Sequence, residues 1–125
     1  MGTNIKIGKL PKAFGPYSVV SAVDNLLFVS GQFPVDIETN QMIEPDIEKQ
    51  THCILTNIKN FIYDNGLNMK SVVKTTVYLK NIDDFPKMND IYSNYFEIPY
   101  PARAVIEASR LPKDSLIEIE CVIKK

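Results

Sequence analysis

The sequence has 125 residues, with 14 Lys and Arg against 15 Asp and Glu, so its formal net charge at pH 7 is -1. This length is typical of one domain, which we expect to span residues 1–125. The near-neutral charge disfavours a nucleic-acid partner, because surfaces that bind phosphate backbones carry a basic excess. One histidine, His52, and two cysteines without a C-x-x-C pair cannot supply the usual zinc ligand sets or a metal site built on them.

The chain contains no stretch that approaches 18 consecutive apolar residues, and residues 1–12 lack the apolar core of a signal peptide. We therefore expect a cytoplasmic protein with no membrane partner. In a reducing cytosol, Cys53 and Cys121 are expected to be free thiols that serve as small packing residues.

The first predicted elements are two short strands. Residues 18–23 and 26–30 are rich in apolar residues and are separated by Asp24 and Asn25, a pair typical of a two-residue hairpin turn. Residues 35–45, which follow, are polar and turn-like.

A long amphipathic helix is predicted to begin at Asp46 and to end near Asn65 and Gly66, where a glycine can close the helix. Its apolar positions recur at helical spacing: Ile47, Ile54, Leu55, Ile58, Phe61 and Ile62.

Residues 72–79 are rich in Val, Thr and Tyr and predict a strand. A second helix is expected to start near Asp83 and Asp84, where acidic residues favour the positive end of the helix dipole. Its apolar stripe consists of Phe85, Met88, Ile91, Tyr92, Tyr95 and Phe96.

Two further strands are predicted near the C-terminus. Pro99 and Pro101 favour an extended entry into a strand at residues 103–108, and residues 111–114 form a turn with proline second. Residues 116–123 alternate between two faces. One face carries Ile117, Ile119, Cys121 and Ile123, and the other carries Glu118, Glu120 and Val122.

This order of elements indicates an α+β or α/β domain in which two helices cover one face of a sheet. The other face carries Glu118 and Glu120, and we expect Arg103 and Glu107 on it, at matching alternate positions of the preceding strand. Such a charged face is a solvated outer surface, a wet pocket or a subunit interface.

Arg103 lies in an otherwise apolar strand, where arginine is rarely found without an anionic partner. It either forms an internal ion pair with Glu107, Glu118 or Glu120, or binds a substrate carboxylate through its planar guanidinium. Tyr17 also has two possible roles: its ring packs in the core, or its hydroxyl faces a pocket.

Nucleophilic catalysis finds little support. Ser30 lacks the G-x-S-x-G elbow, and Gly31 is better explained by a close backbone approach. His52 lies near a helix start, where a structural role is expected.

Short sequence blocks are distributed along nearly the whole chain: GPYS at 15–18, FVSGQFPV at 28–35, VVKTTVYL at 72–79, DF at 84–85, MN at 88–89, PAR at 101–103, LPKD at 111–114 and IEIE at 117–120. In these blocks and in their order, the sequence resembles the RidA (YjgF) family of enamine/imine deaminases.

The resemblance implies a chorismate-mutase-like homotrimer whose three sheets form an inner barrel, with helices outside and active sites between subunits. It also implies hydrolysis of 2-iminopropanoate and 2-iminobutanoate to 2-oxo acids and ammonia without a cofactor. By matching positions, Arg103 would bind the substrate carboxylate and Glu118 would orient or deprotonate the attacking water. The pocket would be lined by Tyr17, Ser30, Gly31, Asn89 and Val105. Many members carry Ser, then Cys or Ala, where this chain has Ala104 and Val105.

The expected distance between the two catalytic residues depends on strand pairing. A symmetric hairpin about residues 111–114 would place Arg103 opposite Val122 and Glu107 opposite Glu118, a like-charge pair that is disfavoured. Arg103 and Glu118 would then lie about 13 Å apart along the ladder. Either the register differs or the pair comes from different chains.

Two other functions remain open. A trimer could bind small carboxylates, or a partner protein, for regulation with little turnover, because Arg103 would serve a binding site equally well. RNA cleavage, a role attached to some relatives, is disfavoured by the charge balance and by the lack of a histidine pair.

Overall fold

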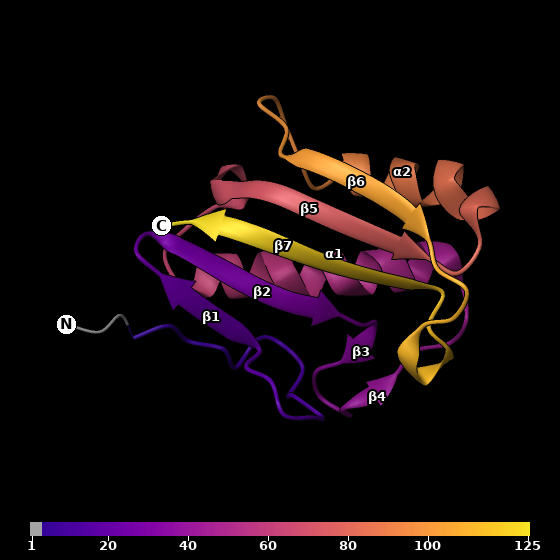
Figure 1. The fold of residues 1–125 in the computed structure, drawn as a ribbon, viewed down its shortest axis with the longest axis horizontal. Coiled ribbons are helices and arrows are strands. Elements are labelled where there is room, and N and C mark those ends of the chain that lie inside the picture. Colours follow the sequence, from indigo (N-terminus) through magenta and orange to yellow (C-terminus); the bar gives the residue numbers. More distant parts are fainter. Residues whose placement is uncertain (1–3) are drawn as a thin grey trace.

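The computed structural model describes residues 4–125 and contains a five-stranded sheet with both α-helices on one of its faces (Figure 1). The elements are β1 (Val20–Val23), β2 (Leu26–Gln32), β3 (Val35–Asp36), β4 (Gln41–Met42), α1 (Ile47–Asp64), β5 (Val72–Leu79), α2 (Phe85–Ser93), β6 (Ala102–Glu107) and β7 (Ile117–Lys124).

The predicted N-terminal hairpin is confirmed. β1 pairs with β2 in antiparallel register, with Val23 opposite Leu26, and Asp24 in the turn has a φ of 51°. Aspartate tolerates this left-handed conformation better than most residues, which suits it to a two-residue turn.

The first helix also agrees with its sequence signals. The Asp46 side chain caps α1 by accepting a hydrogen bond from the backbone N–H of Lys49 at 2.9 Å. Past its C-terminal end, Gly66 has a φ of 75°, a conformation that glycine adopts without strain.

Residues 35–45 contain more structure than expected. β3 and β4 pair there as a small hairpin, and Asn40 turns the chain with a φ of 58°. Strands of two residues leave no alternating pattern, so polarity alone predicted only a turn.

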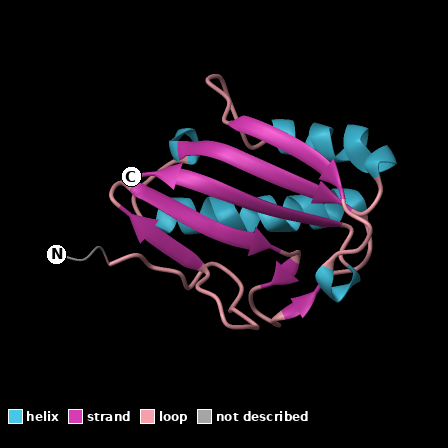
Figure 2. Ribbon diagram, viewed as in Figure 1, coloured by secondary structure: helices cyan, strands magenta, loops and turns pink. Residues whose placement is uncertain are grey.

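The strand order is β1-β2-β7-β5-β6, in which β5 and β6 run parallel and the other neighbours are antiparallel (Figure 2). The symmetric hairpin considered for the last two strands does not form, because β5 lies between β6 and β7. The linker is a wide loop, in which Lys113 and Asp114 have φ values of 60° and 54°, and it carries the chain past β5.

This topology changes the faces assigned to the charged residues. Arg103 pairs with Thr75, a buried residue on the helix side, so Arg103, Val105 and Glu107 point toward α2. Glu118 and Glu120 point to the opposite face, so the expectation that all four charged side chains share a face is wrong.

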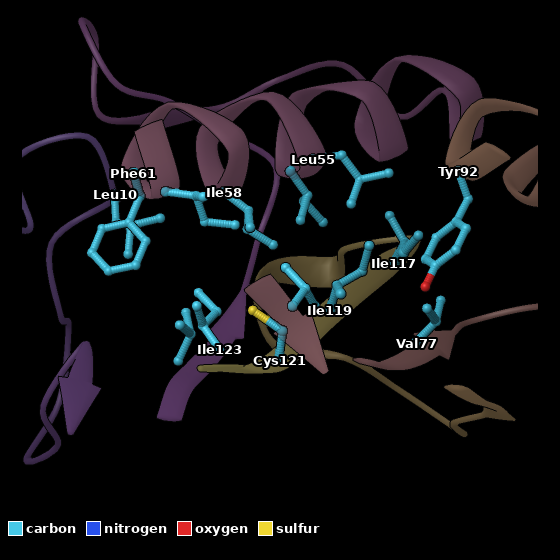
Figure 3. Packing of buried hydrophobic residues seen from close by; sticks show 14 of the residues in the cluster. Leu10, Leu55, Ile58, Phe61, Val77, Tyr92, Ile117, Ile119, Cys121 and Ile123 are labelled. Atoms are coloured by element: carbon cyan, nitrogen blue, oxygen red, sulfur yellow. The ribbon is translucent and has the colours of Figure 1, made fainter. Parts of the chain in front are cut away.

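The core lies between α1 and the sheet, where Leu55 and Ile58 face the alternating apolar side of β7 (Figure 3). Cys121 on this side is buried, and burial raises its pKa to about 12. Cys53 and Cys121 are both free thiols, as predicted.

The other face of the sheet is not covered by any helix of residues 4–125 (Figure 2). Its large apolar side chains include Phe28 and Ile106, which are 43% and 46% exposed. Neither described helix is long and apolar enough to cross a bilayer.

Candidate functional site

The uncovered sheet face is hollowed beside β2 and β7. The hollow has a volume of about 550 Å³ and is bounded by the rings of Phe14, Tyr17 and Phe28 and by the Glu118 side chain. Ser30 and Gly31 form part of its floor. Four residues singled out in the sequence, namely Tyr17, Ser30, Gly31 and Glu118, therefore lie together.

An irregularity in β2 brings Glu118 against the backbone. Val29 pairs with Cys121 and Gln32 pairs with Ile119, so the two residues between them face one residue of β7, as in a β-bulge. A Cβ atom at position 31 would overlap the Glu118 carboxylate, so glycine provides the space that this carboxylate occupies.

The hydroxyl of Ser30 already has a partner, because its Oγ donates to the backbone oxygen of Ser18 at 2.7 Å. Ser30 therefore contributes to the shape of the hollow and holds β2 against the segment before β1, which contains Ser18. This bond also argues against a nucleophilic role for the hydroxyl.

Glu118 is the half-buried acid of the hollow. Burial raises the pKa of Glu118 above the ordinary value for a glutamate, and the nearby charge of Glu120 raises it further. Glu120 accepts a hydrogen bond from the Tyr78 hydroxyl at 3.0 Å. A raised pKa makes the Glu118 carboxylate a better proton acceptor at neutral pH.

Arg103 lies elsewhere, on the edge strand β6 beside α2. Its Nη1 donates to Oδ1 of Asn89 at 2.8 Å, and its guanidinium carbon lies 4.7 Å and 5.5 Å from the ring centroids of Tyr92 and Phe85. The side chain is nevertheless exposed. Arg103 is therefore held in place with donors still available.

No acid pairs with this arginine in residues 4–125, where the ion pairs are Lys49 with Glu44 and Lys80 with Asp114. Glu107, on the same strand, accepts a hydrogen bond from the backbone N–H of Ile82 at 2.9 Å. None of the internal ion pairs considered for Arg103 is thus formed among residues 4–125.

Arg103 and Glu118 do not meet within one chain. They lie on opposite faces of the sheet, two strands and three residues apart in register, which separates their Cα atoms by about 14 Å. One chain therefore presents two separate groups: an acid in a hollow and an arginine at an edge. Val105 and Asn89 lie on the arginine side, away from the hollow.

Sequence reasoning missed the aromatic residues at both places. Phe14 and Phe28 line the hollow, while Phe85 and Tyr92 lie against Arg103. The exposed position of Phe28 follows from strand alternation, since it precedes the buried Val29. The contact of Arg103 with α2 required the parallel pairing of β6, which no local pattern reveals.

A metal site is not formed by the part of the chain that the structure describes, since no three His, Cys, Asp or Glu side chains cluster there. His52 lies on α1, where its Nδ1 and the Tyr95 hydroxyl form a hydrogen bond of 2.5 Å. This contact ties the segment after α2 to α1 and agrees with the structural role expected for the histidine.

Known proteins from several organisms resemble this chain over most of its length. A RutC family protein from Pyrococcus abyssi is 49% identical over 117 residues, covering 94% of this chain and 92% of that protein. A 2-iminobutanoate/2-iminopropanoate deaminase from Dermatophagoides farinae is 34% identical over 113 residues, covering 90% and 88%. The crystal structure of RidA from an Antarctic Psychrobacter species matches with a TM-score of 0.90 at 33% identity, over 99% of this chain and 100% of that chain.

These similarities extend over nearly the whole sequence and the whole described fold. The family model described as Endoribonuclease L-PSP matches residues 7–125. The chain therefore belongs to the Endoribonuclease L-PSP (RidA/YjgF) family, as its sequence blocks indicated.

Proposed function

We propose that this protein hydrolyses 2-imino acids, in particular 2-iminopropanoate and 2-iminobutanoate, to 2-oxo acids and ammonia. The observation that carries the proposal is the exposed guanidinium of Arg103, held by Asn89 and lacking an acidic partner in residues 4–125. Such a group is suited to a small carboxylate. A relative that carries the deaminase name supports the same reaction class.

The reaction needs little beyond a positioned water. The protonated imine carbon is electrophilic, so water attacks C2 while Glu118 accepts one of the water protons. The resulting carbinolamine takes a proton on nitrogen from Glu118, and its C–N bond breaks as the hydroxyl proton passes to the departing ammonia. The products are a 2-oxo acid and ammonium, and Glu118 returns to its starting form.

The proposed site requires two chains. Because Arg103 and Glu118 lie on opposite faces of one sheet, a substrate that touches both must lie between the β6 edge of one copy and the hollow of another. A homotrimer with the uncovered sheet faces turned inward, in a chorismate-mutase-like barrel, provides three such sites. It also buries the exposed Phe28 and Ile106.

The charge of the hollow favours this reaction over RNA cleavage. Its described lining includes Glu118 and Glu120 and no basic side chain, so a phosphodiester bound there would face two carboxylates. A neutral or cationic imine nitrogen suits the same surroundings.

A coupled assay tests the proposed activity. A threonine dehydratase releases 2-aminocrotonate, which tautomerises to 2-iminobutanoate, and we expect the purified protein to accelerate 2-oxobutanoate formation at low dehydratase concentration. An unchanged rate, combined with calorimetric binding of 2-oxobutanoate, would instead favour a regulatory carboxylate-binding trimer. A rate that rises only with dehydratase concentration would reject the activity.

Replacing Gly31 with alanine is expected to lower turnover without unfolding the protein. The new Cβ would overlap the Glu118 carboxylate, which is the movable end of a side chain, so the carboxylate shifts rather than the backbone. A shift of about 1 Å in a catalytic group typically costs about 100-fold in rate. Steady-state kinetics and thermal unfolding of the variant measure the two effects separately.

Gly8→Ala is the matched control, because a Cβ at position 8 meets no atom within 4 Å. We expect wild-type turnover from this variant. Equal turnover of Gly31→Ala and Gly8→Ala would show that the position of the Glu118 carboxylate does not matter to the reaction.

A further inference from the structure

One face of α2 is directed at Arg103. Phe85, Asn89 and Tyr92 follow one another at spacings of four and three residues, which places them on the same side of the helix. All three contact the arginine: Asn89 accepts its Nη1 hydrogen bond, and the two rings lie 5.5 Å and 4.7 Å from its guanidinium carbon.

The Tyr92 side chain is held in place by burial, by a hydrogen bond and by ring packing. It is 6% exposed, and its hydroxyl shares a hydrogen bond of 2.8 Å with Oγ1 of Thr75, the residue paired with Arg103 in the sheet. Its ring also packs on Phe96 with a centroid distance of 4.5 Å. In Figure 3 the ring extends toward the sheet, with its hydroxyl at the sheet end.

We propose that Tyr92 and Phe85 form an aromatic platform that positions the Arg103 guanidinium to bind a planar carboxylate. The proposal rests on the proposed function, in which this carboxylate belongs to the 2-imino acid. Tyr92 and Phe85 are positioning residues, since they act on the substrate through Arg103.

The chemistry of the guanidinium explains why rings are suitable supports. A delocalised planar cation stacks on aromatic faces, which restricts its rotation while leaving in-plane N–H groups free for the two oxygens of a carboxylate. An acidic partner would hold Arg103 equally well, but it would compete with the substrate for the same donors. Rings and the neutral amide of Asn89 orient the charge without neutralising it.

Binding measurements can separate this role from simple packing. We expect Tyr92→Leu and Phe85→Leu each to weaken 2-oxobutanoate binding, measured by calorimetry, by roughly 5- to 30-fold. Tyr92→Phe, which keeps the ring and loses the bond to Thr75, should weaken binding less than Tyr92→Leu. Phe85 is only half-buried, so its variant tests the platform even where Tyr92→Leu fails to fold.

Phe61→Leu is the matched control, because Phe61 is a buried core ring that lies at the other end of the core from Tyr92 (Figure 3). It should lower the unfolding temperature and leave the Kd for 2-oxobutanoate unchanged. If Phe61→Leu and Phe85→Leu weaken binding equally, the rings act through general packing and the proposal is overturned.

A double-mutant cycle gives the second test. Arg103→Lys keeps the charge and loses the planar cation, so adding Phe85→Leu to Arg103→Lys should cause little further loss of affinity. Additive losses would contradict the platform, as would a wild-type protein that does not bind 2-oxobutanoate. Because the readout is binding, an absence of turnover would reject the proposed function and leave the platform standing.

Discussion

Replacing Arg103 with alanine is expected to lower kcat/KM for 2-iminobutanoate by roughly 10- to 150-fold, the loss that follows from removing a charged hydrogen-bond donor worth about 1.5–3 kcal/mol. The chain should still fold, because Arg103 is an exposed residue of an edge strand and its side chain donates a hydrogen bond to Asn89. The coupled deaminase assay measures the first effect, and circular dichroism with thermal unfolding measures the second.

Arg110→Ala is the control for this substitution, since Arg110 is the other arginine of the sequence and is also exposed. It should retain wild-type turnover. Equal losses in the two variants would mean that net charge, rather than a carboxylate site at Arg103, controls the rate.

The same variant tests whether the site is shared between chains. If Arg103 and Glu118 come from different copies, co-expressing Arg103→Ala with Glu118→Gln forms some sites that have both native residues. For random mixing in a ring this is about one quarter of the sites, so activity should return to about that level. Two differently tagged copies of Arg103→Ala provide the control, and no recovery in the mixed sample would place both residues in one chain's site.

The local elements of the fold could be predicted because their signals are local. The strand at residues 72–79 and the helix after Asp46 agree with β5 and α1, since alternation, helical periodicity and a cap residue are read within one segment. The pairing of β6 could not be predicted in this way. Two successive strands with a short turn favour a hairpin, whereas in this fold α2 connects β5 to β6 and these two strands pair in parallel.

The same error explains what was missed in the candidate site. With β6 placed beside β7, Arg103 and Glu118 are assigned to one face, whereas the parallel pairing turns Arg103 toward Tyr92. The acid side was easier to predict, because Gly31 and Glu118 lie in blocks that resemble the family and come together on neighbouring strands.

Glu118, the proposed proton acceptor, also affects the stability of the fold. Its pKa is raised in the folded protein, first by burial and second by Glu120, so the folded state binds the proton more tightly than the unfolded state does. Its contribution to stability is therefore fully present below the unfolded pKa of about 4.3 and is lost as pH rises through the higher folded value. At neutral pH the ionised carboxylate is retained at a cost in stability, as is common for catalytic acids and bases.

Glu118→Gln is accordingly expected to change activity and stability in opposite directions. Turnover should fall by about 10²- to 10⁴-fold, the usual contribution of a general base. The free energy of unfolding relative to wild type should increase as the pH rises above the unfolded value of about 4.3, because glutamine does not ionise at the half-buried position. Denaturant titrations across this pH range measure the second effect.

In Glu120→Gln, the pKa of Glu118 falls, so the acidic limb of the pH–rate profile should move to lower pH. A limb that stays in place would show that a group other than Glu118 accepts the proton from water.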